Sequence, residues 1–117
     1  MNVLWLGAPH GMVNLVRHWL EGSPDIKILE TSTVGEALGI VVEGRTKIDK
    51  IIFGDHPENH SNAVREIVKR LRGKAIFLGA SSHGNLADHY ASLGIPEFTP
   101  NNREAIVVWI ARRMPGT

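Results

Sequence analysis

The chain of 117 residues contains no cysteine, which excludes disulfide frameworks, thiolate catalysis and zinc–sulfur sites. No apolar run approaches the length of a membrane span, and the N-terminus lacks the basic segment of a signal peptide. The chain also lacks an excess of charge of either sign, because 13 Lys and Arg are balanced by 12 Asp and Glu, which gives a formal charge of +1. We therefore expect a cytoplasmic domain with no membrane contact and no general attraction to nucleic acid.

What the chain does have is enough apolar sequence for one hydrophobic core, with 43% hydrophobic residues over the length of one domain. We predict a single domain over residues 1–114. Residues 115–117 read Pro-Gly-Thr, which is typical of a linker or a C-terminal tail. This ending favours a domain that is continued by further domains of a longer protein.

Short apolar runs alternate with segments of helical periodicity along the whole chain. Between the runs, apolar residues recur at the spacing of one helix face, as in residues 64–71. Thr33 with Glu36 and Asn101 with Glu104 have the spacing of a capping box, which predicts that helices begin there. Glycine follows three predicted helix ends, at residues 44, 73 and 94. The apolar runs predict five strands, at residues 3–6, 26–29, 48–53, 75–78 and 97–99.

Five strand–helix units of this length predict the α/β class, as a (βα)₅ doubly wound parallel sheet with strand order 2-1-3-4-5. Ligand sites of such sheets lie at the carboxyl ends of the strands, where the strand order reverses. We call this end of the sheet the crest. The loops that we expect there are residues 7–11, 54–60 and 79–84.

Several short motifs at the crest and on the helices occur in a familiar order. Asp55 closes the third predicted strand and is followed by His56-Pro57, while Glu36-Ala37-Leu38 lies on the second predicted helix. Leu78-Gly79-Ala80 closes the fourth strand, and Leu93-Gly94-Ile95 leads into the fifth. This series resembles the response-regulator receiver domains, which have a flavodoxin-like fold. The resemblance implies that Asp55 stands where the family has its phosphoacceptor aspartate.

The departures from the family pattern concern the chemistry of phosphoryl transfer. Receivers hold Mg²⁺ with an acidic pair after the first strand, where this chain reads Gly7-Ala8. Gly79 replaces the family's Ser or Thr, and Thr99 replaces its Lys. A carboxylate that attacks a phosphoryl group needs a cation to neutralise charge. We therefore predict a degenerate member, a pseudo-receiver that is not an enzyme, needs no cofactor and acts in signal transduction through protein–protein contact.

The resemblance also implies a setting for such a domain. Degenerate receivers occur in two-component response regulators, in transcription regulators and at the N-terminus of Walker-type ATPases. The partner expected from this setting is another protein or a further domain of the same chain.

Histidine supports an alternative function. Four of the six histidines fall in the three crest loops, and imidazole together with a carboxylate suits Zn²⁺ or Ni²⁺. No compact metal motif is present, so we predict no metal site, and the alternative is a small-ligand or metal-binding domain that uses these loops. The residues concerned are His10, His56, His60 and His83.

The last predicted helix is apolar over more than one stripe, since residues 105–110 are six apolar residues in succession. Packing a helix onto a sheet needs only three or four apolar positions in two turns. At least one of these residues should therefore point away from the sheet. We predict a homodimer through the C-terminal edge, with an interface formed by Leu86, Tyr90, Leu93, Val107, Val108 and Ile110.

Overall fold

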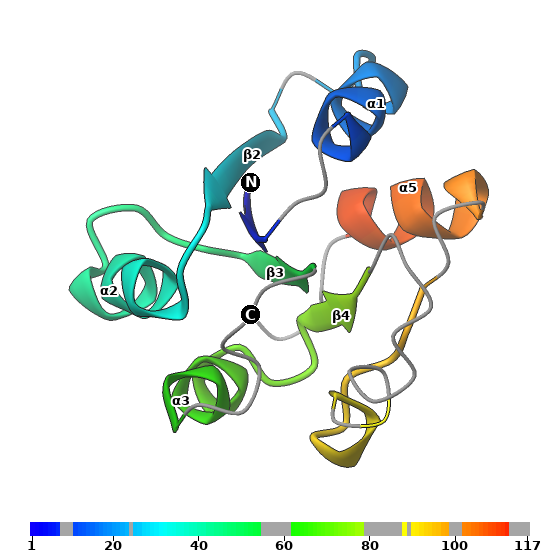
Figure 1. Ribbon diagram of the computed structural model, residues 1–117. Helices are drawn as coiled ribbons and strands as arrows, with labels where there is room; N and C mark the ends of the chain where they lie inside the picture. The colour runs from blue at the N-terminus through cyan, green and yellow to red at the C-terminus, as the bar shows by residue number, and fades with distance from the viewer. Residues whose placement is uncertain are drawn as a thin grey trace.

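The computed structural model describes residues 1–7, 11–23, 25–54, 62–78, 88, 90–98 and 102–112. Four parallel strands form one sheet in the order β2-β1-β3-β4. Helices lie on both sides of the sheet (Figure 1). The bounds of the strands are β1 Asn2–Leu6, β2 Lys27–Thr31, β3 Lys50–Phe53 and β4 Ala75–Phe77.

The predicted α/β class is confirmed, and the observed order matches the first four positions of the predicted order 2-1-3-4-5. At the place of the fifth strand, the described residues contain one isolated parallel bridge, between Phe77 and Glu97. The backbone continues this contact, because the Phe98 N–H donates to the Phe77 carbonyl at 2.9 Å. Residues 97 and 98 therefore lie along the free edge of β4.

The helices divide into two layers. Helices α1 (Met12–Trp19) and α5 (Arg103–Ala111) cover one face of the sheet, while α2 (Val34–Glu43) and α3 (Asn62–Arg70) cover the other (Figure 1). None of the described helices is long and apolar enough to cross a membrane.

Successive side chains of a strand point to opposite faces of the sheet, so each central strand contributes to the hydrophobic clusters on both faces. Leu4 and Phe53 belong to the hydrophobic cluster under α2 and α3, whereas Trp5 and Ile52 belong to the cluster under α1 and α5. Because both faces are covered, β1 and β3 have no solvent side, which explains why their sequences are nearly all apolar.

Two predicted helix ends are confirmed and one is corrected. The Thr33 hydroxyl accepts from the Glu36 N–H at 3.2 Å, and Gly44 ends α2 in the left-handed region with φ 70°. The predicted cap of α5, Asn101, is wrong by one residue. Asn102 is the N-cap, because its side-chain oxygen accepts from the Ala105 N–H at 3.2 Å.

Candidate functional site

Two glycines at the crest, Gly7 after β1 and Gly54 after β3, lie within the described residues. They allow the backbones of the two strand ends to approach each other closely. Gly7 follows β1 with φ 70° and donates its N–H to the Thr31 carbonyl at 2.9 Å. The Gly54 N–H donates to the Leu6 carbonyl at 2.7 Å. A Cβ built on Gly54 would lie 2.4 Å from the Gly7 carbonyl oxygen. The two strand ends are thus in direct backbone contact, with no space for a side chain at residue 54.

This contact bears on the chemistry that the resemblance implied. The resemblance aligns Gly7 with the first position of the family's acidic pair, and its φ of 70° lies in the left-handed region that favours glycine.

Replacing Gly54 with alanine should lower the free energy of unfolding by about 1–3 kcal/mol, the usual range for overpacking a close-packed site. The obstacle is a backbone oxygen, which cannot move aside by changing rotamer. Gly35 on α2 is a matched control, since a Cβ there meets nothing within 4 Å. Gly35→Ala should leave stability unchanged or raise it, by up to about 1 kcal/mol. Equal urea midpoints for the two variants would contradict the crest contact.

The remaining residues predicted for the crest lie outside the described part of the chain. This holds for Asp55, for Leu86 of the predicted interface and for the four histidines. Among the described residues, no group of three or more His, Cys, Asp or Glu side chains could hold a metal ion. The small-ligand and metal-binding alternative therefore stays a prediction, for His10, His56, His60 and His83.

The described part of the predicted interface is narrower than the sequence suggested. Tyr90 and Ile110 are fully buried inside the domain, so a partner cannot contact them without unfolding the core. Leu93 and Val107 are half-buried. Val108 is 56% exposed, which confirms that the apolar run of the last helix turns one side chain outward.

Sequence reasoning missed the most unusual group of the structure, Lys50. It is the first residue of β3, is only 1% exposed and lies on the face that carries α5. Its Nζ donates to three carbonyl oxygens at the end of α5, those of Trp109, Ile110 (3.0 Å) and Arg112. The Trp109 ring centroid lies 4.9 Å from the same nitrogen. The signal in the sequence was a charged residue inside a strand that both helix layers cover.

The electrostatics of Lys50 follow from its burial. Loss of hydration lowers the pKa of Lys50 from 10.5 to about 8, and the positive charge of Arg112 acts in the same direction. Asp49 opposes the shift. The carboxylate of Asp49 is itself held in place, since it accepts from the Asn2 N–H at 2.8 Å and lies 3.9 Å from the Lys47 amine.

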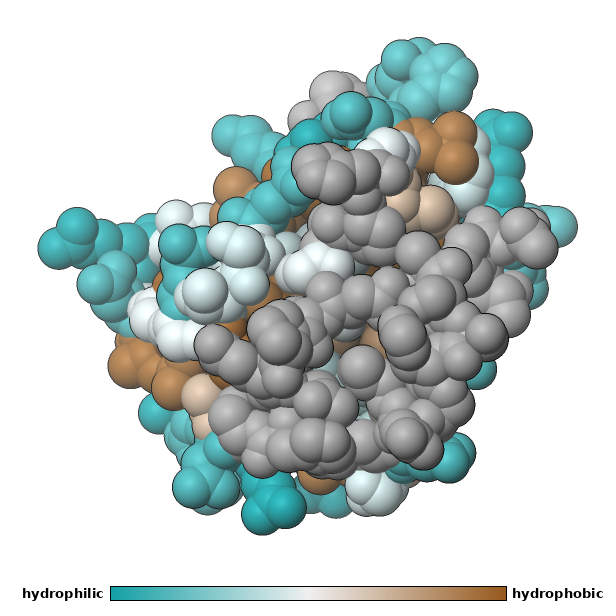
Figure 2. Space-filling view, viewed as in Figure 1, coloured by the Kyte–Doolittle hydropathy of each residue, from teal (hydrophilic) through white to brown (hydrophobic). Residues whose placement is uncertain are grey.

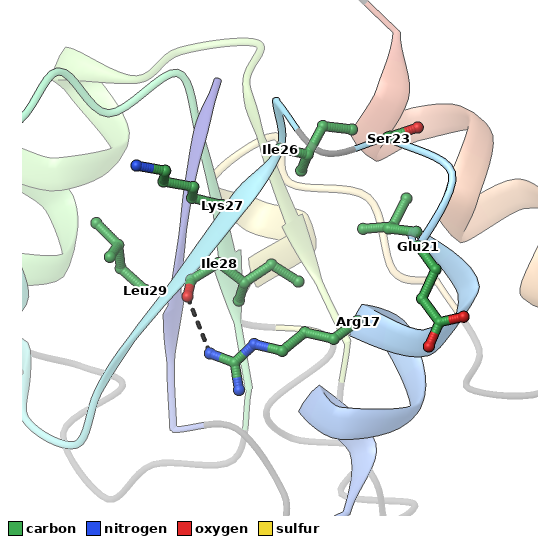
Figure 3. Close-up of a pocket in the computed structure, with 8 residues that line it drawn as sticks. Arg17, Glu21, Ser23, Ile26, Lys27, Ile28 and Leu29 are labelled. Carbon is green, nitrogen blue, oxygen red and sulfur yellow. Dashed lines mark hydrogen bonds between the residues drawn. The ribbon is translucent and has the colours of Figure 1, made fainter.

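An open groove of about 450 Å³ runs between the end of α1 and the outer edge of β2 (Figure 3). Arg17 reaches across it and donates to the Ile28 carbonyl at 3.0 Å, and its other terminal nitrogen lies 3.4 Å from the Glu30 carboxylate. The outer edge of β2 is thus partly occupied by a side chain of the same chain.

A second groove, of about 510 Å³, lies between α1 and the outer side of α5. The Arg103 guanidinium lies 5.6 Å from the Trp19 ring centroid, in cation–π geometry. Val107 and Val108 also line this groove. The outward-facing apolar residues of α5 therefore border a recess rather than a flat surface.

No protein-family model matches the chain, and no curated protein is similar to it in sequence. Solved structures are similar in fold. The response regulator RcsB of Salmonella typhimurium has a TM-score of 0.64 and 13% identity over 99% of this chain. RcsB bound to the promoter rprA in the presence of the phosphomimetic BeF₃⁻ has a TM-score of 0.61 and 13% identity, over 98% of this chain and 70% of that one.

A designed Rossmann 2x3 protein gives a TM-score of 0.59 at 12% identity, over 99% of this chain and 98% of the designed one. This chain spans 63% of the first RcsB chain. At such low identities the likeness establishes a receiver-like α/β fold and leaves the function open.

Proposed function

We propose that the chain is a pseudo-receiver domain, which acts in signalling or regulation through protein–protein contact and without Mg²⁺-dependent phosphoryl transfer. The observation that carries the proposal is Gly7, a left-handed glycine at the crest of a receiver-like fold. The partner is another protein, a further domain of the same chain or a second copy, in a pathway of the two-component type.

The physical reason is the charge that accumulates during phosphoryl transfer. The attacking carboxylate and the phosphoryl oxygens are all negative, so the reaction needs a cation held beside them. Mg²⁺ is held in such sites by carboxylates and water. With Gly7 in place of an acid, the only carboxylate of the family pattern that remains is Asp55, and one carboxylate is a poor Mg²⁺ site.

The proposal predicts that Asp55 is not phosphorylated. Incubation with Mg²⁺ and acetyl phosphate should leave the mass unchanged, and beryllofluoride should leave the amide NMR spectrum unchanged. Asp55→Asn is the matched control, since it removes the attacking oxygen without changing the size of the side chain. Saturable, Mg²⁺-dependent shifts that disappear in Asp55→Asn would show a working receiver and overturn the proposal.

The contact surface belongs to α5, where Val108 is exposed beside the half-buried Val107. Burying an exposed valine on association contributes roughly 1–2 kcal/mol. We therefore propose a homodimer through this C-terminal edge. Replacing Val108 with glutamate would remove the apolar burial and would also take a charged carboxylate out of water.

Val108→Glu should accordingly weaken self-association at least about tenfold, because it removes roughly 1.4 kcal/mol or more, while leaving the fold intact. Analytical ultracentrifugation with circular dichroism measures both effects. Val42 is a matched control, because it is a valine of similar exposure, 51%, on a different helix, α2. Figure 2 shows hydrophobic surface on the left side of the molecule, where α2 lies. A wild type that stays monomeric at high micromolar concentration, or equal effects of Val42→Glu and Val108→Glu, would contradict this interface.

A further inference from the structure

The exposed face of α5 carries apolar, small and charged side chains in a fixed order. Residues four and eight positions apart lie on one face of a helix. Glu104, Val108 and Arg112 have this spacing, and all three are exposed. Two alanines flank the stripe, Ala105 and Ala111. The face therefore has a negative charge near its start, an apolar side chain in the middle and a positive charge at its end.

Both charged side chains of this face are open to a partner. Among the described residues, neither Glu104 nor Arg112 forms an ion pair within the chain. The backbone of Arg112 is held in place, because its carbonyl oxygen accepts from the Lys50 amine. At the other end, the side chain of Asn102 caps the first turn through the Ala105 N–H. Hydrogen bonds thus fix both ends of the helix that presents the two charges.

We propose that a second copy of the chain docks on this face with its own α5 antiparallel, about a two-fold axis that passes beside Val108. The pairing rests on the contact surface proposed above, and adds the orientation of the second copy and its charge contacts. The axis brings Val108 against Val108 of the second copy and places Glu104 of each copy opposite Arg112 of the other. It also places Ala105 opposite Ala111, and side chains this small allow two helices to approach to about 8 Å.

The charges of the face decide between the two possible orientations. In a parallel pair each residue of the stripe would meet its own counterpart, so Glu104 would face Glu104 and Arg112 would face Arg112. Like charges across an interface disfavour association, whereas unlike charges fix its register. The antiparallel pair turns all four charges into two reciprocal attractive contacts, as an isologous interface requires. The face is therefore complementary to itself in the antiparallel orientation.

The contact is small, because it consists mainly of one helix from each copy. Interfaces that bury less than about 1,200 Å² are typical of transient complexes. Solvent reaches the ion pairs at the rim, so they contribute less to the affinity than to the choice of orientation. We therefore expect a weak dimer with a specific geometry.

Disulfide trapping tests this geometry. The chain has no cysteine, so a single introduced thiol can be oxidised only against its own copy, and a disulfide needs Cβ atoms about 3.5–4.5 Å apart. Val108→Cys lies at the axis and should give a covalent dimer. Glu104→Cys is the matched control on the same face, because antiparallel pairing holds the two copies of residue 104 about 12 Å apart, eight residues along a helix. It should stay monomeric alone and give a mixed dimer with Arg112→Cys. Equal trapping of Val108→Cys and Glu104→Cys would show a parallel pair and overturn the proposal.

Charge reversal tests the ion pairs independently, with sedimentation as the measurement and circular dichroism as the check of folding. Glu104→Arg and Arg112→Glu should each weaken self-association at least about tenfold, because each places like charges opposite one another twice. An equal mixture of the two variants should associate as the wild type does, since every pair is again of unlike charge. If both variants associate like the wild type while Val108→Glu does not, the antiparallel pairing is wrong and the α5 contact surface stands. A monomeric wild type would overturn the pairing and the homodimer together, and would leave the proposed absence of phosphoryl transfer unaffected.

Discussion

Tyr90→Ala should lower the free energy of unfolding by about 3–5 kcal/mol, the range expected for truncating a large buried aromatic side chain. Tyr90 is 0% exposed and stacks between two other rings. Its ring centroid lies 5.0 Å from that of Phe53, with 30° between the planes, and 4.9 Å from that of Phe77, with 25° between the planes. Alanine would leave a cavity that faces the ends of β3 and β4, which rigid strands cannot close.

Urea denaturation measures the loss, and Tyr90→Phe is the matched control. Phenylalanine keeps both stacking contacts, so its effect should be limited to the hydroxyl, about 1 kcal/mol. The comparison also decides between core and interface for this residue. A Tyr90→Ala protein that unfolds at the wild-type midpoint but no longer self-associates would restore the interface role that the sequence predicted.

Raising the pH should stabilise the wild type relative to Lys50→Met by about 3 kcal/mol between about pH 8 and about pH 10.5. The sign follows from the lowered pKa of Lys50, about 8 in the folded state against 10.5 for an ordinary lysine. Below pH 8 both states hold the proton, and the folded state bears the full cost of burying the charge. Between the two values the unfolded state binds more protons, so the stability difference grows with pH until it levels off.

Chemical denaturation at a series of pH values gives this difference directly, since other titrating groups cancel between the two proteins. Lys27→Met should follow the wild type at every pH, because that lysine is exposed at the start of β2. A flat difference between wild type and Lys50→Met would mean that the amine is hydrated in the folded protein. A difference of opposite sign would mean that the three helix carbonyls stabilise the ammonium form by more than burial disfavours it.

The strands and helix starts could be predicted because their causes are local. Apolar runs without polar alternation are typical of strands covered on both faces, and β1 and β3 are such strands. The Thr33 cap depends on residues three positions apart, so it was visible in the sequence. The cap of α5 could not be assigned to one residue from the sequence, because two asparagines stand in succession at positions 101 and 102 and asparagine is a favoured N-cap at either.

Contacts between distant segments could not be predicted in the same way. The helical stripe showed which residues of α5 share a face, but a helix with six successive apolar residues presents more than one apolar stripe. Only the packed structure shows that Ile106 and Ile110 face the sheet and that Val108 does not. Lys50 could be recognised as a charge in a covered strand, but its acceptors lie at the far end of the chain. The approach of Gly7 to Gly54 likewise depends on the order of strands.

Arg17 has a consequence for the colloidal behaviour of the protein. β2 is the last strand on its side of the sheet, and an open strand edge is a template on which other chains can add strands and start fibril growth. By donating to the Ile28 carbonyl, Arg17 occupies an acceptor that an incoming strand would need. The salt bridge to Glu30 is exposed and adds little to stability. We therefore expect the hydrogen bond from Arg17 to Ile28 to disfavour edge-to-edge polymerisation of the domain in concentrated solution.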